Sequence, residues 1–133
     1  MKLKFIGTIQ DEIYIMLKED AVIKEKLSGI YLSIQQDAKY PFGLINFTEV
    51  RDFSKYLHAR YELEFEICLF SRDKSQSKLL SISDHVESIL TSEMEFEEFK
   101  IVSLRKQKAE WIRGQDILTT KLAIKYKALI SNV

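Results

Sequence analysis

The glutamates Glu62, Glu64 and Glu66 alternate with apolar residues in the segment RYELEFEICLF, and their spacing is the most suggestive of chemistry in the chain. Carboxylate oxygens are the ligands that Ca²⁺ and Mg²⁺ prefer. On a strand, however, same-face residues two positions apart are separated by about 6.5–7 Å, which is too wide for all three carboxylates to share one small ion. The spacing therefore favours a solvated or lysine-paired face over a metal site.

The two histidines and the single cysteine do not complete another ligand set. Neither His58 nor His85 has a Cys, His or carboxylate at the spacing of a zinc site. Asp84 and His85 are adjacent, but neighbours on a helix point about 100° apart, so they form no catalytic dyad. We interpret Cys68 as a small packed residue, because nothing beside it would lower its pKa. We expect no metal and no cofactor.

Catalytic loops are also missing from the sequence. The glycines are isolated, so there is neither a phosphate-binding loop nor a dinucleotide fingerprint. No serine lies in a G-x-S-x-G elbow, and no nucleophile and base are arranged together. We expect a protein that is not an enzyme.

One basic stretch offers a hint of nucleic-acid contact: Arg105, Lys106 and Lys108, with Trp111 nearby. An ordinary exposed strand has the same composition, and neither a groove-reading helix nor an aromatic stacking platform accompanies it. The whole chain balances 20 basic residues against 20 acidic ones, so no net field attracts DNA, RNA or an anionic membrane. We expect no sequence-specific nucleic-acid partner and no membrane partner.

Size and composition indicate one globular domain, residues 1–133, with 46% hydrophobic and 30% charged residues. No stretch has the 18 or so apolar residues that span a bilayer. Gln10, Asp11 and Glu12 interrupt the first apolar run where a signal peptide needs a continuous one. The single cysteine cannot form an internal disulfide, so we expect the protein in the cytoplasm.

Helical spacing of apolar residues predicts long helices over residues 4–18 and 79–90. Asp20 is expected to cap a short helix over 21–27, which Gly29 then stops. Ser and Asp residues of the segment SRDKSQS are expected to cap the second long helix. The acidic EMEFEEF that follows this helix is a loop or a ragged edge.

Strands are expected over residues 30–34, 42–50, 57–70, 99–112 and 117–130, the last two paired as a hairpin through a turn at 113–116. Strict alternation from Leu57 to Phe70 points odd positions to a core and even positions outward. In the last strand the apolar residues at even positions are Leu118, Leu122, Ile124, Tyr126, Ala128 and Ile130. Lys121, Lys125 and Lys127 occupy its other face. If these two strands are neighbours, opposite charges face each other at about 0.2–1 kcal/mol per pair.

This order of elements predicts an α+β fold, in which an antiparallel sheet of four to five strands carries two main helices packed on one face. The other face of the sheet stays uncovered.

The motif order resembles the tail-completion proteins of long-tailed bacteriophages and of gene transfer agents, also called tail terminators or head-to-tail joining proteins. The resemblance covers nearly the whole chain and rests on Tyr40-Pro41-Phe42, Asp52-Phe53-Ser54, Leu69-Phe70-Ser71-Arg72 and Ser75, in that order. One departure is the last turn, where Arg113-Gly114-Gln115-Asp116 has a single glycine and the family often has several.

The resemblance implies a structural virion assembly protein. Copies would form a hexameric ring at the end of the tail tube, stop its growth and offer a docking surface to the head connector protein. The partners would be other copies of the chain, the tail tube protein and the connector. The isolated chain can remain a monomer until a tail tip templates the ring. Assembly would take place in the bacterial host cytoplasm, and the mature particle would carry the protein in its tail.

Candidate interface residues lie on the charged strands and in the loops that leave strand ends. The glutamates are available either to the lysine strand of the same subunit or to a neighbouring subunit. The loops at 35–39 and 52–56 are contact loops or plain solvent-exposed turns. The candidates are Glu62, Glu64, Glu66, Asp37, Tyr40, Asp52, Phe53, Arg72, Lys121 and Lys125.

The alternative from another class is a small ligand-binding or regulatory α+β domain with a pocket between helices and sheet. The sequence shows no cluster of convergent polar groups that would mark such a pocket.

Overall fold

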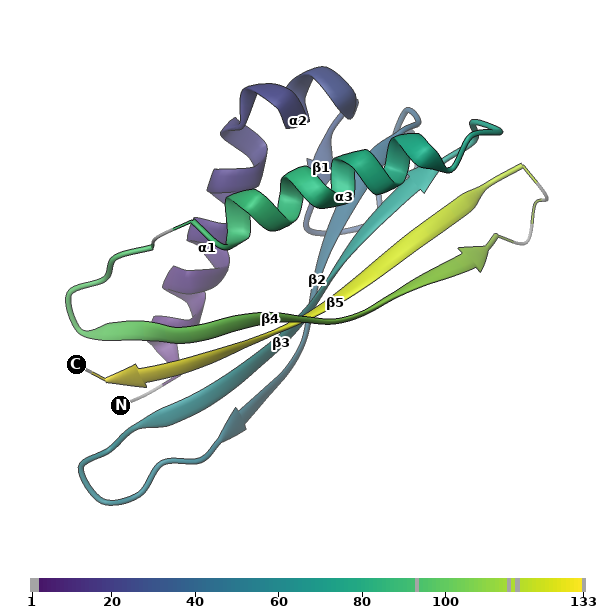
Figure 1. Ribbon diagram of the computed structural model, residues 1–133. Helices are drawn as coiled ribbons and strands as arrows, with labels where there is room; N and C mark the ends of the chain where they lie inside the picture. The colour runs from purple at the N-terminus through teal and green to yellow at the C-terminus, as the bar shows by residue number, and fades with distance from the viewer. Residues whose placement is uncertain (1–2, 93, 115, 117, 133) are drawn as a thin grey trace.

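The computed structural model describes residues 3–92, 94–114, 116 and 118–132. These residues form three helices and five strands in a mixed order along the chain. Figure 1 shows how the elements are arranged in space. The elements are α1 (Lys4–Glu19), α2 (Ala21–Lys26), β1 (Ile30–Tyr31), β2 (Phe42–Asp52), β3 (Arg60–Ser71), α3 (Ser77–Leu90), β4 (Phe99–Arg113) and β5 (Thr120–Asn132).

The strands form one sheet in the order β1-β2-β3-β5-β4. The four long strands are antiparallel to their neighbours, and β4 and β5 form the expected hairpin. The α+β fold is therefore confirmed. The sheet is antiparallel except at one edge, where the short strand β1 runs parallel to β2 and pairs only with Gly43 and Leu44.

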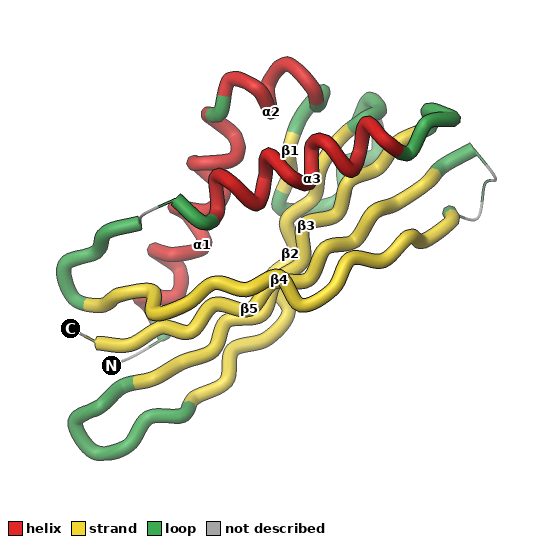
Figure 2. The backbone as a smooth tube through the Cα atoms, in the orientation of Figure 1, coloured by secondary structure: helices red, strands yellow, loops and turns green. Residues whose placement is uncertain are grey.

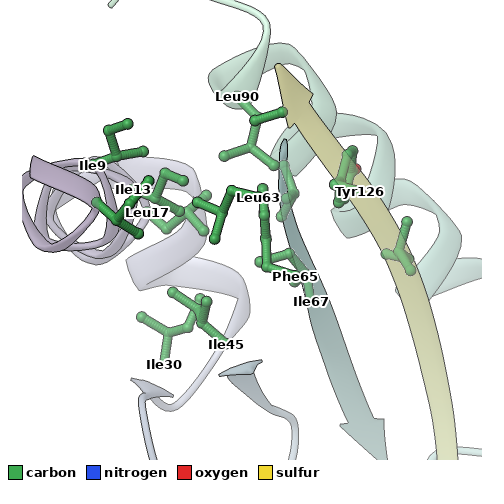
Figure 3. Packing of buried hydrophobic residues seen from close by; sticks show 14 of the residues in the cluster. Ile9, Ile13, Leu17, Ile30, Ile45, Leu63, Phe65, Ile67, Leu90 and Tyr126 are labelled. Atoms are coloured by element: carbon green, nitrogen blue, oxygen red, sulfur yellow. The ribbon is translucent and has the colours of Figure 1, made fainter. Parts of the chain in front are cut away.

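All three helices lie on one side of the sheet, as the tube in Figure 2 makes plain. Helix α1 contributes Ile9, Ile13 and Leu17 to the core, and each of these side chains is fully buried. Figure 3 shows them facing Leu63 and Phe65 of β3. Burying apolar side chains contributes about 25 cal/mol per Å² removed from water. This helix–sheet layer is therefore the main source of stability.

The alternation in β3 was predicted correctly for residues 61–69. Its odd positions are at most 4% exposed, whereas the glutamates at even positions are half-buried on the other face. Phe65 stacks on Tyr126 of β5, with ring centroids 5.5 Å apart. The two central strands thus place aromatic rings under the helices and charges on the open face.

The structure confirms one of the helix ends expected from the sequence and differs from the expectation at two others. The Asp20 carboxylate accepts hydrogen bonds from the amides of Val22 and Ile23, each at 3.1 Å, so the predicted cap of α2 is confirmed. Gly29 does not end this helix in a left-handed conformation, because Leu27 already leaves it extended. At α3 the N-cap is Gln76 with no side-chain hydrogen bond, so the expected Ser or Asp cap is wrong.

Strand bounds differ from expectation at several ends. Residues 57–59 belong to the β2–β3 turn, and residues 32–34 leave the sheet after β1. Leu118, expected to face the core, precedes β5 and is 66% exposed. Gln115 and Ile117, which belong to the expected turn and strand, lie outside the described residues. For residues 32–34, residues 57–59 and Leu118, the apolar alternation continues past the last residue of the strand.

Candidate functional site

The open face of the sheet carries the predicted charge rows. Lys125 Nζ lies 3.3 Å from Glu64 Oε1, and Lys127 Nζ lies 3.7 Å from Glu62 Oε1. In the strand register Glu64 lies directly opposite Lys127. Each lysine therefore pairs with the glutamate diagonal to it and not with the glutamate directly opposite. These side chains are 16–32% exposed, which means that the strands hold them partly within the sheet surface. Two of the three glutamates therefore have lysine partners within the chain.

Glu66 faces Lys125 across the ladder, and the Cys68 thiol donates weakly to Glu66 Oε2 at 3.9 Å. Burial raises the pKa of the Cys68 thiol, which keeps this sulfur protonated and unreactive. Within the part of the chain that the structure describes, no three His, Cys, Asp or Glu side chains are grouped to hold a metal ion. The described charges of the open face are therefore arranged mainly as ion pairs within the chain.

An aromatic cluster occupies the corner of this face where β2 begins and β3 ends. Phe42 stacks on Phe70 with centroids 4.7 Å apart, and Tyr40 packs against Phe42 at 5.2 Å. The Arg72 guanidinium lies 4.3 Å from the Tyr40 ring centroid, and the Lys121 ammonium lies 5.8 Å from that of Phe70. Three predicted interface residues, Tyr40, Arg72 and Lys121, thus meet in one cluster.

Arg72 also ties the β3 end to the last hairpin. Its guanidinium donates to Asp116 Oδ2 at 3.2 Å and to the Thr119 hydroxyl at 3.2 Å. The Thr119 hydroxyl, the amides of Thr119 and Leu118 and the Arg72 charge together lower the pKa of Asp116, although desolvation opposes them. The Arg72 side chain is therefore held in place between a ring and a carboxylate.

The remaining candidates lie in loops. Asp52 and Phe53 begin the turn between β2 and β3, where the Asp52 carboxylate accepts a hydrogen bond from the Ser54 amide at 2.8 Å. Phe53 is 49% exposed. Asp37 is exposed in the loop between β1 and β2, away from the hairpin turn. The candidate residues therefore fall into an open face, a corner and two separate loops.

The candidate contact loop at 52–56 includes Tyr56, which is 106% exposed, and Leu57 beside it is 88% exposed. Sequence reasoning missed Leu57, because its odd position continues the apolar alternation of the strand expected over 57–70. The turn contains neither Gly, Pro nor Asn, so the usual signals of a hairpin turn are missing. Large apolar side chains that are exposed together make this turn a candidate contact surface.

A space of about 550 Å³ opens beside Tyr40 and the first turn of α3, lined also by Arg72 and Lys78. Both cations have carboxylate partners, Asp116 for Arg72 and Asp73 for Lys78 at 2.8 Å. A ligand would have to compete with these pairs. The described helices include none that is long and apolar enough to cross a membrane.

Neither a protein-family model nor a curated protein sequence matches the chain. A solved structure described as "Virion of native gene transfer agent (GTA) particle" contains a chain with a similar fold. The two chains are 16% identical in sequence and superpose with a TM-score of 0.79, over 98% of this chain and 99% of that chain. The chain thus shares its complete fold with a component of that particle.

Proposed function

We propose that this protein is a structural virion assembly protein. Copies of it form a hexameric ring at the end of the tail tube, terminate tail growth and join the tail to the head connector protein. Assembly takes place in the bacterial host cytoplasm, and the protein remains in the tail of the particle. The observation that carries the proposal is the end-to-end fold similarity to a chain of a gene transfer agent virion.

The surface of the chain supports a role in contact and not in chemistry. Its open face offers ion pairs, its corner offers an arginine-capped aromatic cluster, and its hairpin turn offers exposed apolar residues. A ring needs a heterologous interface, in which one patch of a subunit meets a different patch of its neighbour. Several distinct contact surfaces on one chain meet that need.

Deleting the gene from the genome that carries it, and imaging the particles by electron microscopy, tests the proposal. We expect tails of uncontrolled length and heads without tails, and expression of the wild-type chain should restore joined particles. Normal particles from the deletion strain would contradict the proposed function.

A further inference from the structure

The turn between β2 and β3 is a tightly closed hairpin, and we call residues 53–60 the hairpin tip. The Phe53 amide donates to the Arg60 carbonyl at 2.7 Å, and Lys55 and His58 exchange backbone hydrogen bonds of 2.9 and 2.8 Å. Tyr56 and Leu57 are therefore the two corner residues of a two-residue turn. Their side chains project from the end of the molecule into solvent.

Tyr56 has a backbone φ of 50°, the only positive value among the described residues other than glycine. This left-handed conformation favours glycine or asparagine and is unfavourable for a bulky aromatic residue. Strained residues of this kind concentrate at sites that bind ligands or partners. An exposed tyrosine held in a position suited to glycine indicates that its ring has a contact to make.

A second surface with apolar lining lies at the same end of the sheet. A space of about 510 Å³ lies between the end of α3 and the start of β4, and we call it the apolar groove. Phe96 and Phe99 stack in its wall with centroids 4.4 Å apart. The apolar residues that line it are Leu90, Met94, Phe96, Phe99, Ile101, Val102 and Leu104.

The charges around the two surfaces are opposite. The hairpin tip carries Lys55 and Arg60, both exposed and close to Tyr56 in the chain. The loop beside the apolar groove carries Glu95, Glu97 and Glu98, which are also exposed, and Lys100 is the one cation among the described residues that line the groove. An apolar tip with a basic surround thus matches an apolar groove with an acidic rim. Complementary charges of this kind steer association and fix its orientation.

The sheet places the tip and the groove so that a second copy can join them. Arg60 of β3 pairs with Ser131 of β5, and Ser131 pairs with Lys100 of β4, so tip and groove lie at the same end of the sheet. The groove lies toward the edge of the sheet that β4 forms. The tip lies toward the opposite edge, which is formed by the part of β2 that does not pair with β1. Figure 1 shows the tip and the loop after α3 near the two termini.

Copies placed side by side with their strands aligned would bring the tip of one beside the groove of the next. In this arrangement β4 runs antiparallel to the neighbour's β2, because successive long strands alternate in direction. One patch then meets a different patch at every junction, which is the requirement for a closed ring.

We propose that the hairpin tip of one copy docks into the apolar groove of the adjacent copy, with Lys55 and Arg60 facing the glutamates of its rim. This inference rests on the proposed ring and identifies the residues that join its subunits. Tyr56 and Leu57 act as the apolar anchor of each junction.

Disulfide trapping in assembled particles tests the junction. Leu57→Cys and Val102→Cys introduce thiols at positions that are 88% and 48% exposed, whereas the natural Cys68 is only 2% exposed. Particles carrying both substitutions in each chain should give a ladder of covalent multimers after oxidation, ending at the closed ring. Particles with either substitution alone should give no ladder and serve as controls.

Charge reversal supplies an independent readout. Lys55→Glu with Arg60→Glu should reduce incorporation of the chain into particles by about tenfold or more. Adding Glu95→Lys and Glu97→Lys to the same chain should restore incorporation. A matched reversal at the exposed Lys39 and Lys74, far from both surfaces, should leave incorporation unchanged.

The outcomes separate this inference from the proposed function. A doubly substituted chain that is incorporated without a ladder, or that becomes linked to a different protein, would overturn the tip-in-groove junction while the structural role stands. A wild-type chain absent from the particles would contradict the proposed function and this inference with it.

Discussion

Tyr126 has a buried hydroxyl, and the described residues provide no hydrogen-bond partner for it. Burial, assisted by the charges of Glu87 and Asp84, raises the pKa of this phenol above its ordinary range. An unsatisfied buried polar group costs about 1–3 kcal/mol, whereas the ring itself packs on Phe65. The side chain is therefore retained for its ring and not for its hydroxyl.

Removing that hydroxyl should stabilise the protein. We expect Tyr126→Phe to raise the free energy of unfolding by about 1 kcal/mol, measured by urea denaturation. Tyr126→Leu is the matched control, because it loses the stacked ring and should destabilise the protein. A less stable phenylalanine variant would mean that the hydroxyl has a partner that the packing does not reveal.

Asp20 joins two helices, because its carboxylate caps α2 and lies 2.7 Å from His85 Nε2 on α3. Desolvation raises the pKa of Asp20, but the Ile23 amide, His85 and the Val22 amide together outweigh it and lower the pKa. A carboxyl whose pKa is lower in the folded state stabilises the fold above its unfolded pKa. This stabilisation is lost as pH falls through the folded pKa.

Asp20→Ala should therefore lower the free energy of unfolding by about 1–2 kcal/mol at pH 7. The difference from wild type should shrink when the pH is lowered below about 4, where the unfolded carboxyl is protonated. Urea denaturation at the two pH values measures it, with Asp11→Ala on the exposed side of α1 as the control. An undiminished difference at low pH would contradict a role for the Asp20 charge.

At the scale of elements, the adjacency of β3 and β5 makes the open face a paired surface within one chain. Reversing Glu62 and Glu64 to lysine should lower the free energy of unfolding by about 1–2 kcal/mol, because two pairs are replaced by repulsion. Adding Lys125→Glu and Lys127→Glu should recover most of this loss in a double-mutant cycle.

Asp11→Lys with Glu25→Lys is the control for that cycle, since both residues are exposed on helices far from the charge rows. A cycle with no coupling energy would contradict pairing within the chain. It would favour the alternative, in which the glutamates contact a neighbouring subunit.

Most helices and strands were predictable from the sequence, because the spacing of the apolar residues shows which face of an element is buried. Helix α1 and strand β3 show this well, and the pairing of charged rows was implied by Glu64 and Lys125 on neighbouring strands. The hairpin tip was predictable only in part. Tyr56 lies in the candidate contact loop at 52–56, but Leu57 fits the strand period, and the turn lacks the glycine that normally marks such a position. The apolar groove was missed because Phe96 and Phe99 come together only in three dimensions.

Edge strand β4 shows how the chain avoids open-ended aggregation. It has two bulges, between Ile101 and Ser103 and between Lys106 and Lys108, and its outer half is exposed on both faces. Bulges and lysines on an edge discourage indiscriminate strand pairing. In the proposed ring, side chains at the tip and the groove would determine which copies meet, and a continuous hydrogen-bonded ladder would not.

For the whole molecule, the balance of 20 basic and 20 acidic residues leaves no long-range field, so its interactions depend on local patches. The proposed subunit would meet its own copies, the tail tube protein and the connector protein, and contact surfaces at several separate places are consistent with that proposal. The chain shares its fold with a chain of a gene transfer agent virion.

Electron cryomicroscopy of purified particles that contain this chain is the direct test of its proposed place in the virion. We expect a closed ring of this fold at the head-proximal end of the tail tube, between the tube and the connector. Density for this fold elsewhere in the particle, or its absence from every particle, would contradict the proposed function.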